Sequence, residues 1–199
     1  MIELELKALV PELATARRRI ETSGARLVFA GRLEDVRYDY EDRRLAGQDL
    51  VLRLRVYRDS SGTATSSSLD WKGPSILDGK YKQREELNVG LTDPDTLATI
   101  LERLGLVVTM RIDRDIWQYE LHGAIVRFER YPRMDDLVEV EGSPDDIESA
   151  IRVLGLSRDS FTTERLPDFA RRFEARTGQL AALSDAELAG TVRYDVDNA

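Results

Sequence analysis

Residues 2–8 read Ile-Glu-Leu-Glu-Leu-Lys-Ala, an unbroken alternation of apolar and charged residues. Side chains alternate between the two faces of a strand, so Glu3, Glu5 and Lys7 share one face while the apolar residues occupy the other. A single strand of this kind is typical of any sheet with one face in water. The informative observation is that the same arrangement returns in most of the later strand-like segments.

Five later segments also alternate charged and apolar residues. The charged positions are Arg53 and Arg55, Asp70 and Lys72, Lys82, Arg84 and Glu86, Arg127 and Glu129, and Glu139 and Glu141. If the sheet closes into a barrel with its apolar face outside, these side chains converge on the lumen. The alternative is a curved open sheet whose charged face is solvated. A solvated face is usually rich in Thr, Ser and Gln rather than Glu, Arg and Lys, but the pattern leaves both open.

Length and composition restrict the class of protein. The 199 residues fit one domain with a substantial core. The formal net charge of −8 provides no positive field for nucleic acid or an anionic membrane, so we expect neither partner. Cysteine is absent, which excludes disulfides and thiolate chemistry. No apolar run of signal or membrane length precedes the first strand, so we expect a cytoplasmic protein.

The sequence also restricts the kind of metal site. His122 is the only histidine and precedes Gly123 between two strand-like runs, so we place it in a hairpin turn. One imidazole cannot build a multi-histidine site. A bound metal would therefore be held by carboxylate oxygens, which favour Mg²⁺ or Mn²⁺.

The remaining segments predict helices around the sheet. Proline or capping residues at the start and glycine at the end favour helices within residues 11–24, 93–105 and 143–155, and a fourth helix spans 161–177 with Pro167 starting or kinking it. We expect separate strands over 26–31 and 33–41, a flexible connection over 59–67, and a partly disordered tail over 179–199. The fold class is α+β, with one domain over residues 1–178.

Several motifs, in this order, resemble the CYTH superfamily, the triphosphate tunnel metalloenzymes, and within it the class IV adenylyl cyclase branch. They are Glu3-x-Glu5-x-Lys7, Tyr38-Asp39, Leu52-Arg53-Leu54-Arg55, Trp71-Lys72-Gly73-Pro74, Lys82-Gln83-Arg84-Glu85-Glu86 and Leu137-Val138-Glu139-Val140-Glu141-Gly142. The resemblance covers about residues 2–156. It implies an eight-stranded antiparallel β-barrel that binds a triphosphate through basic side chains and divalent cations through glutamates.

The resemblance assigns roles to residues of this sequence. The metal-binding set comprises Glu3, Glu5, Glu129, Glu139 and Glu141. The substrate-binding set comprises Lys7, Arg53, Arg55, Lys72, Arg84 and Arg114, to which we add Lys82 and Arg127 from the charged faces. Glu5, Glu139 and Lys7 form the expected catalytic set.

Three substitutions depart from the family pattern. Glu129 stands where an aspartate is usual, Asp135 replaces a glycine, and Ile112 replaces a lysine. The family's C-terminal helix motif is not recognisable over residues 166–169.

The expected activity follows from the charges. A triphosphate needs several fixed cations, and glutamates beside it would be unfavourable unless a divalent cation lay between. We expect a metal-dependent triphosphate-processing enzyme, most readily an adenylyl cyclase that converts ATP to cyclic AMP and pyrophosphate. The alternatives are a triphosphatase acting on inorganic triphosphate, thiamine triphosphate or a nucleoside triphosphate, and a non-catalytic polyphosphate- or nucleotide-binding module. The expected partner is the small-molecule triphosphate, and a homodimer stays an open alternative.

Overall fold

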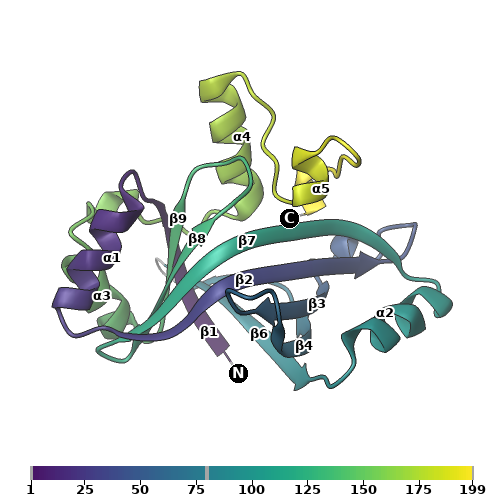
Figure 1. Cartoon of the computed structure of the whole chain (residues 1–199), viewed down its shortest axis with the longest axis horizontal. Coiled ribbons are helices and arrows are strands. Elements are labelled where there is room, and N and C mark those ends of the chain that lie inside the picture. The colour runs from purple at the N-terminus through teal and green to yellow at the C-terminus, as the bar shows by residue number, and fades with distance from the viewer. Residues whose placement is uncertain (1, 79–80, 199) are drawn as a thin grey trace.

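A computed structural model describes residues 2–78 and 81–198. The side chains of residues 2–3, 77–78, 81–82 and 198 lie outside that description. Within these ranges the chain forms a closed antiparallel sheet with helices packed outside it (Figure 1). No helix in the described part of the chain is long and apolar enough to cross a membrane.

Eight strands of the described chain close the barrel in the order β1-β9-β8-β7-β2-β3-β4-β6, with β6 pairing back to β1. They are β1 Ile2–Leu9, β2 Arg26–Asp39, β3 Val51–Arg58, β4 Ala64–Lys72, β6 Tyr81–Gly90, β7 Val107–Leu121, β8 Ala124–Arg130 and β9 Leu137–Glu141. A short further strand, β5 Ile76–Asp78, pairs with β6 beside its junction with β4. The closed eight-stranded barrel predicted from the sequence is confirmed, and the open solvated sheet is excluded.

The strand register places charged residues of neighbouring strands next to each other on the inner face. On β1 and β9, Glu5 lies opposite Glu141 and Lys7 lies opposite Glu139. On β3 and β4, Arg53 lies opposite Asp70. Because side chains alternate along each strand, the apolar residues between these positions face outward.

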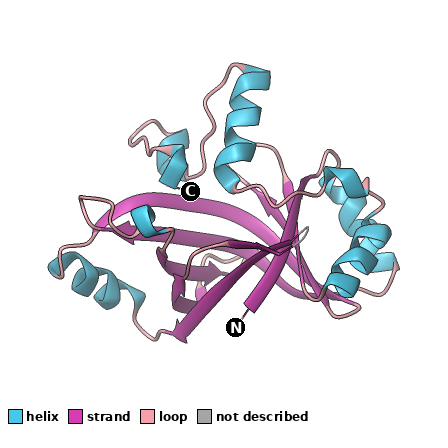
Figure 2. Ribbon diagram, turned by 180° about the vertical axis from the view of Figure 1, so that it is seen from behind, coloured by secondary structure: helices cyan, strands magenta, loops and turns pink. Residues whose placement is uncertain are grey.

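The helices lie outside the barrel in three groups, one at each end and one along a side between them (Figures 1 and 2). Helices α1 Leu13–Thr22 and α3 Pro144–Leu154 lie against each other, and α3 contacts β1, β8 and β9. Their core includes Ile20, Phe128 and Ile151, each at most 2% exposed. Helix α2 Pro94–Arg103 places Leu101 against the outer residues of β2 and β3. The barrel wall is thus apolar outside and charged inside.

Helix ends follow the expected capping chemistry. Asp93 caps α2 by accepting a hydrogen bond from the Thr96 amide, and Ser143 caps α3 by accepting one from the Asp146 amide. Gly155 ends α3 in the left-handed conformation that glycine adopts without strain. The hairpin turn predicted at His122 is confirmed, since it joins β7 to β8.

The fourth helix begins later than the sequence predicted. Helix α4 spans Leu166–Thr177, with Pro167 in its first turn, whereas residues 158–160 form the separate short helix η2 Arg158–Ser160. Proline lacks an amide hydrogen and has a fixed φ angle, so it suits a first helical turn. Pro167 therefore starts the helix rather than kinking a longer one.

Residues 179–198, assigned to a tail in the sequence analysis, pack against the barrel. Leu183 joins the core cluster of Met110 and Phe169, and its carbonyl accepts a hydrogen bond from the Asp113 amide. The segment also contains α5 Asp185–Leu188 and the short helix η3 Val196–Asn198. The domain boundary at residue 178 stays a prediction.

The remaining short helix is η1 Ala46–Gln48, and residues 64–67 of the expected flexible connection belong to β4.

Strand β2 is continuous, although the sequence analysis placed two strands there. It runs through Gly31 and pairs with β7 over nearly its whole length, with register shifts near residues 27–29 and 37–38. Glycine is tolerated at position 31 because β3 approaches closely. A methyl group there would overlap the carbonyl oxygen of Arg58.

We expect Gly31→Ala to lower the free energy of unfolding by about 1–3 kcal/mol, the usual cost of overpacking. Chemical denaturation of the variant measures this change. Gly47→Ala is the matched control, because a methyl group at Gly47 meets nothing within 4 Å. Equal stability of the Gly31 and Gly47 variants would show that the backbone contact at Gly31 is not restrictive.

Candidate active site

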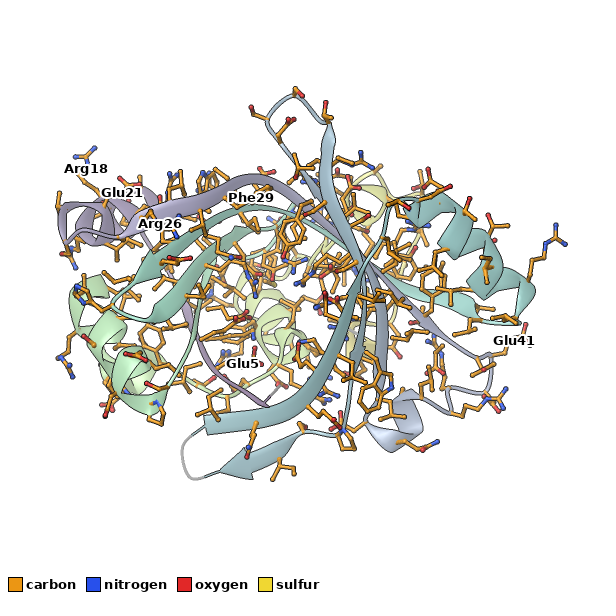
Figure 3. All side chains as sticks on the ribbon, turned by 90° about the horizontal axis from the view of Figure 1, so that it is seen from below. Glu5, Arg18, Glu21, Arg26, Phe29 and Glu41 are labelled. Atoms are coloured by element: carbon orange, nitrogen blue, oxygen red, sulfur yellow. The ribbon has the colours of Figure 1, made fainter. Side chains whose placement is uncertain are left out.

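The barrel contains a cavity of about 240 Å³ that collects the residues predicted from the sequence. Figure 3 shows side chains filling the space between the strands, with Glu5 among them. Eleven predicted site residues line the cavity: Glu5, Lys7, Arg53, Arg55, Lys72, Arg84, Arg114, Arg127, Glu129, Glu139 and Glu141. The other two, Glu3 and Lys82, have side chains outside the described residues. The structure therefore brings together every predicted site residue whose side chain it describes.

Three carboxylates form the acidic part of this cavity. Glu5 on β1 and Glu139 and Glu141 on β9 each offer an oxygen, and these oxygens lie within 4.8 Å of one another. Two cations of the protein itself pair with these carboxylates. Lys7 pairs with Glu5 at 2.9 Å and also with Glu139, and Arg127 pairs with Glu139 and, at 3.0 Å, with Glu141. We call Glu5, Glu139 and Glu141 the carboxylate cluster.

The charge of Glu139 in the carboxylate cluster is stable at neutral pH. Burial by itself would raise the pKa of Glu139, but Arg127 and Lys7 outweigh burial and hold this pKa well below its usual value. Burial would lower the pKa of Lys7, but Glu139 and Glu5 raise it above its usual value. Glu139 is therefore ionised before any ligand arrives. Three carboxylates within reach of one point are a donor set that fits Mg²⁺ or Mn²⁺.

Asp35 is the centre of the basic part of the cavity. It is 1% exposed and accepts two hydrogen bonds from Arg55, at 2.8 and 3.0 Å, and one from Arg114 at 3.0 Å. A nitrogen of Arg53 lies 3.5 Å away. Three guanidinium groups from β3 and β7 thus converge on one carboxylate of β2. This arrangement keeps the three cations close together in a buried position, where they would otherwise repel one another.

Two further carboxylates hold members of this group. Asp70 accepts hydrogen bonds of 2.6 and 3.1 Å from Arg53, and Glu129 accepts one of 2.9 Å from Arg114 and one of 2.5 Å from the Tyr131 hydroxyl. Glu129 was predicted to be a metal ligand. It lines the cavity but is not a member of the carboxylate cluster, and its role as a metal ligand stays a prediction.

The remaining predicted cations are Lys72 on β4 and Arg84 on β6, and both have partners in the lumen wall. Lys72 pairs with Glu86, while the Arg84 guanidinium donates to the carbonyl oxygens of Gly73 and Asp49. Arg84 also pairs with the Asp49 carboxylate at 3.3 Å. Burial and the nearby Arg53 lower the pKa of Lys72, with Glu86 opposing them. These contacts fix both cations on the lumen wall.

Sequence analysis missed several residues that line the cavity, among them Asp35, Arg37 and Tyr131. The signal for the first two was present, because Asp35 and Arg37 alternate with Val36 and Tyr38 like the residues that were chosen. Tyr131 lies just beyond β8, outside any alternating run, so only the fold reveals it.

The buried pairs of Asp35 predict a specific dependence of stability on pH. Burial opposes the charge of Asp35, but Arg53, Arg55 and Arg114 outweigh it and hold the pKa well below its usual value. A carboxyl with a lowered pKa in the folded protein stabilises it at pH values above the unfolded pKa, about 3.9. This stabilisation is lost as the pH falls from about 3.9 through the folded pKa.

We expect Asp35→Asn to lower the free energy of unfolding at pH 7 by about 3–5 kcal/mol, because it leaves buried arginines without their carboxylate. The difference between wild type and variant should stay constant down to about pH 5 and shrink below about pH 4. Denaturant unfolding of both proteins over this range provides the measurement. A difference that shrinks already between pH 7 and 5 would contradict the lowered pKa.

The fold and the charged lumen define a class of closed antiparallel barrels that enclose a polar site. The sequence profile of the CYTH domain matches residues 1–157. The chain belongs to the CYTH domain family, as its motifs indicated.

Known proteins resemble the chain over most of its length. A protein of Methanocaldococcus jannaschii named "putative adenylate cyclase" is 25% identical over 170 residues, which cover 80% of this chain and 93% of that protein. The structure of another protein of that name, from Vibrio parahaemolyticus, superposes with a TM-score of 0.72 at 17% identity, covering 85% of this chain and 97% of that one.

A third similar protein is a "putative adenylyl cyclase" from Hippeastrum, whose structure is described as revealing a dominant triphosphatase activity. It superposes with a TM-score of 0.56 at 16% identity, covering 92% of this chain and 98% of that one. At these identities the two structures show a shared fold.

Proposed function

We propose that this protein is a divalent-metal-dependent enzyme that acts on a triphosphate inside the barrel, with conversion of ATP to cyclic AMP and pyrophosphate as the first candidate reaction. The observation that carries this proposal is the composition of the cavity. A cluster of three carboxylates and a group of buried arginines line the same cavity of about 240 Å³. The carboxylates suit a hard divalent cation, and the arginines suit phosphate oxygens.

The names of the similar proteins support two reactions. Two similar proteins carry the name "putative adenylate cyclase", which favours cyclisation. The Hippeastrum protein is described with a dominant triphosphatase activity, which favours hydrolysis of inorganic triphosphate, thiamine triphosphate or a nucleoside triphosphate. The third candidate, a binding module without catalysis, makes no use of the carboxylate cluster, because carboxylates alone would weaken the binding of an anion.

Each group of lumen residues has a role in the proposed reaction. Glu5, Glu139 and Glu141 would hold the divalent ion, which when bound supplies charge neutralisation at the phosphate groups. Lys7 and Arg127 already hold these carboxylates, so they are placed to bind phosphate oxygens beside them. Arg53, Arg55 and Arg114 would bind the rest of the triphosphate, and arginine is suited to such contacts because it donates two parallel hydrogen bonds.

The two candidate reactions differ in the attacking oxygen. In a cyclase the ribose 3′ hydroxyl attacks the α-phosphorus and pyrophosphate leaves. In a triphosphatase water attacks the terminal phosphorus and orthophosphate leaves. Phosphoryl transfer depends mainly on positioning and charge stabilisation, so the same arginines and carboxylates serve either reaction. The two activities therefore differ in which phosphorus atom and which attacking oxygen the lumen positions.

The test is to incubate the purified protein with Mg²⁺ or Mn²⁺ and, separately, ATP, inorganic triphosphate and thiamine triphosphate, and to identify the products. Cyclic AMP with pyrophosphate supports the cyclase, and release of orthophosphate supports the triphosphatase. Tight binding of all three without turnover would favour the binding module. A protein that neither binds nor converts any of them would contradict the proposal.

The preferred metal, a cytoplasmic location and a homodimer remain predictions. Mg²⁺ and Mn²⁺ both suit carboxylate oxygens, so turnover at equal concentrations of each ion is the measurement that ranks them. Sedimentation of the purified protein measures the oligomeric state.

A further inference from the structure

At one end the cavity is lined by apolar side chains as well as by charged ones. The inward positions of β3 are Val51, Arg53 and Arg55 in turn, so the charged pattern of this strand ends at Val51. Leu50, just before β3, and Leu166, in the first turn of α4, line the same cavity. All three apolar side chains are partly exposed. The cavity therefore offers apolar surface with which a phosphate chain makes no favourable contact.

This apolar end adjoins two of the cations assigned to phosphate. Val51 lies directly opposite Lys72 on β4. On β6, Arg84 donates a hydrogen bond to the carbonyl oxygen of Asp49, the residue before Leu50. A triphosphate bound by Lys72 and Arg84 would thus bring any organic group that it carries against Leu50 and Val51.

The segment that leads into α4 is fixed at the same cavity. The backbone of Thr162 exchanges two hydrogen bonds with that of Lys7, at 2.8 and 2.9 Å, next to the part of β1 that pairs with β6. At the start of α4, Asp168 accepts a hydrogen bond of 3.0 Å from the Arg165 amide. Arg165 and Leu166 line the cavity from this position outside the barrel strands. Both lie beyond residue 157, where the match to the CYTH profile ends.

Arg165 adds a planar cation to this end of the cavity. Its side chain is exposed and lies near the loop before β3. Burial opposes the charge of Asp49, but hydrogen bonds from Ser75, with smaller contributions from Arg84 and Arg165, lower the pKa of this carboxyl. Arg165 also acts on the charge of Arg84. A positively charged ligand group would therefore meet two arginines here, whereas the flat face of a neutral aromatic ring can stack on a guanidinium.

We propose that four side chains form a subsite for the base of a nucleoside triphosphate: Leu50, Val51, Leu166 and Arg165. This assignment rests on the proposed function, since it requires a triphosphate in the barrel. The guanidinium of Arg165 stacks on the base, and the apolar side chains cover its remaining surface.

The subsite selects among the candidate substrates. Inorganic triphosphate leaves it unfilled. Thiamine triphosphate would place its positively charged thiazolium ring beside Arg84 and Arg165, which is unfavourable. A nucleoside triphosphate fills the subsite without this repulsion.

Calorimetric titration of the wild type in the presence of Mg²⁺ tests this selection with two ligands. One is imidotriphosphate, a triphosphate analogue that resists hydrolysis. The other is the β,γ-imido analogue of 3′-deoxyadenosine triphosphate, which also lacks the hydroxyl needed for cyclisation. We expect the nucleotide analogue to bind at least tenfold more tightly. Equal affinities would overturn the subsite, and tighter binding of thiamine triphosphate, measured by competition, would overturn the choice of a base.

The variant Arg165→Gln separates contact with the base from contact with phosphate. It should bind the nucleotide analogue at least fivefold more weakly and imidotriphosphate like the wild type, with an unchanged unfolding temperature because Arg165 is exposed. Arg18→Gln is the matched control, since Arg18 is exposed at the periphery of the molecule (Figure 3), and it should bind both ligands like the wild type. Equal weakening of both ligands by Arg165→Gln, or no weakening of either, would overturn the assignment.

Failure of the subsite and failure of the proposed function give different results. If the wild type binds both analogues with equal affinity, the proposed function stands and only the subsite fails. If the wild type binds neither analogue, the proposed function fails and the subsite fails with it.

Discussion

Replacing Glu5 with glutamine is expected to reduce metal-dependent turnover by about 100-fold or more. Loss of a residue that merely supports a metal ligand typically costs about 10–100-fold, so loss of a ligand should reach the upper end of that range. The amide of glutamine is neutral and would leave two carboxylates in the cluster. The fold should persist, because Lys7 keeps its pair with Glu139.

Product formation and thermal unfolding of Glu5→Gln measure the two parts of this prediction. Glu41→Gln is the matched control, since Glu41 is exposed and lies at the periphery of the molecule (Figure 3). The control should retain wild-type turnover. Wild-type turnover in Glu5→Gln would remove Glu5 from the mechanism, and unfolding at a much lower temperature would show that the carboxylate serves stability.

Replacing Arg53 with methionine should have the largest combined effect on stability and binding. Arg53 is 8% exposed and pairs with Asp70 at 2.6 Å. Its loss leaves the buried Asp70 carboxylate without its nearest cation, with Arg55 3.9 Å away, which should lower the free energy of unfolding by about 3 kcal/mol. Loss of a desolvated phosphate contact should also weaken triphosphate binding by about 2–5 kcal/mol.

A double variant separates the two effects of Arg53. In Arg53→Met with Asp70→Asn the stranded carboxylate is neutralised, so part of the lost stability should return. The affinity for imidotriphosphate should stay low, because the guanidinium that binds the anion is still absent. Recovery of binding together with stability would show that Arg53 acts by maintaining the fold and makes no contact with the substrate.

The lumen could be predicted from the sequence because strand periodicity determines which side chains share a face. Once Glu5 and Lys7 point inward, the period of two places every alternate residue of β1 inward as well, and the same holds for Arg53 and Arg55 on β3. The charge on these faces was compatible with a polar cavity or with a solvated open sheet. The resemblance to the CYTH superfamily decided in favour of the closed barrel.

The ion pairs within the lumen could not be predicted in the same way. Which acid holds which base depends on strand order and register, and these follow from how the sheet closes. Arg114 reaches Asp35 because β7 lies beside β2, although the two residues are far apart in sequence. The same information separates Glu129 from the carboxylate cluster, where its sequence pattern resembled that of Glu139.

Local steric effects account for the errors in the elements. Gly31 suggested a break between two strands, but the close approach of β3 requires glycine within one continuous strand. Residues 161–165 were predicted to be helical, but Pro167 lies in the first turn and α4 begins at Leu166. In both cases a residue that usually interrupts an element is part of it.

The measurement that tests the central claim most directly is a crystal structure of the protein with Mn²⁺ and imidotriphosphate, with the ion located by its anomalous scattering. The account predicts one Mn²⁺ within bonding distance of Glu5, Glu139 and Glu141. It also predicts phosphate oxygens contacting Arg53, Arg55 and Arg114 in the lumen. Manganese and analogue bound outside the barrel, with the ion pairs of the lumen unchanged, would contradict it.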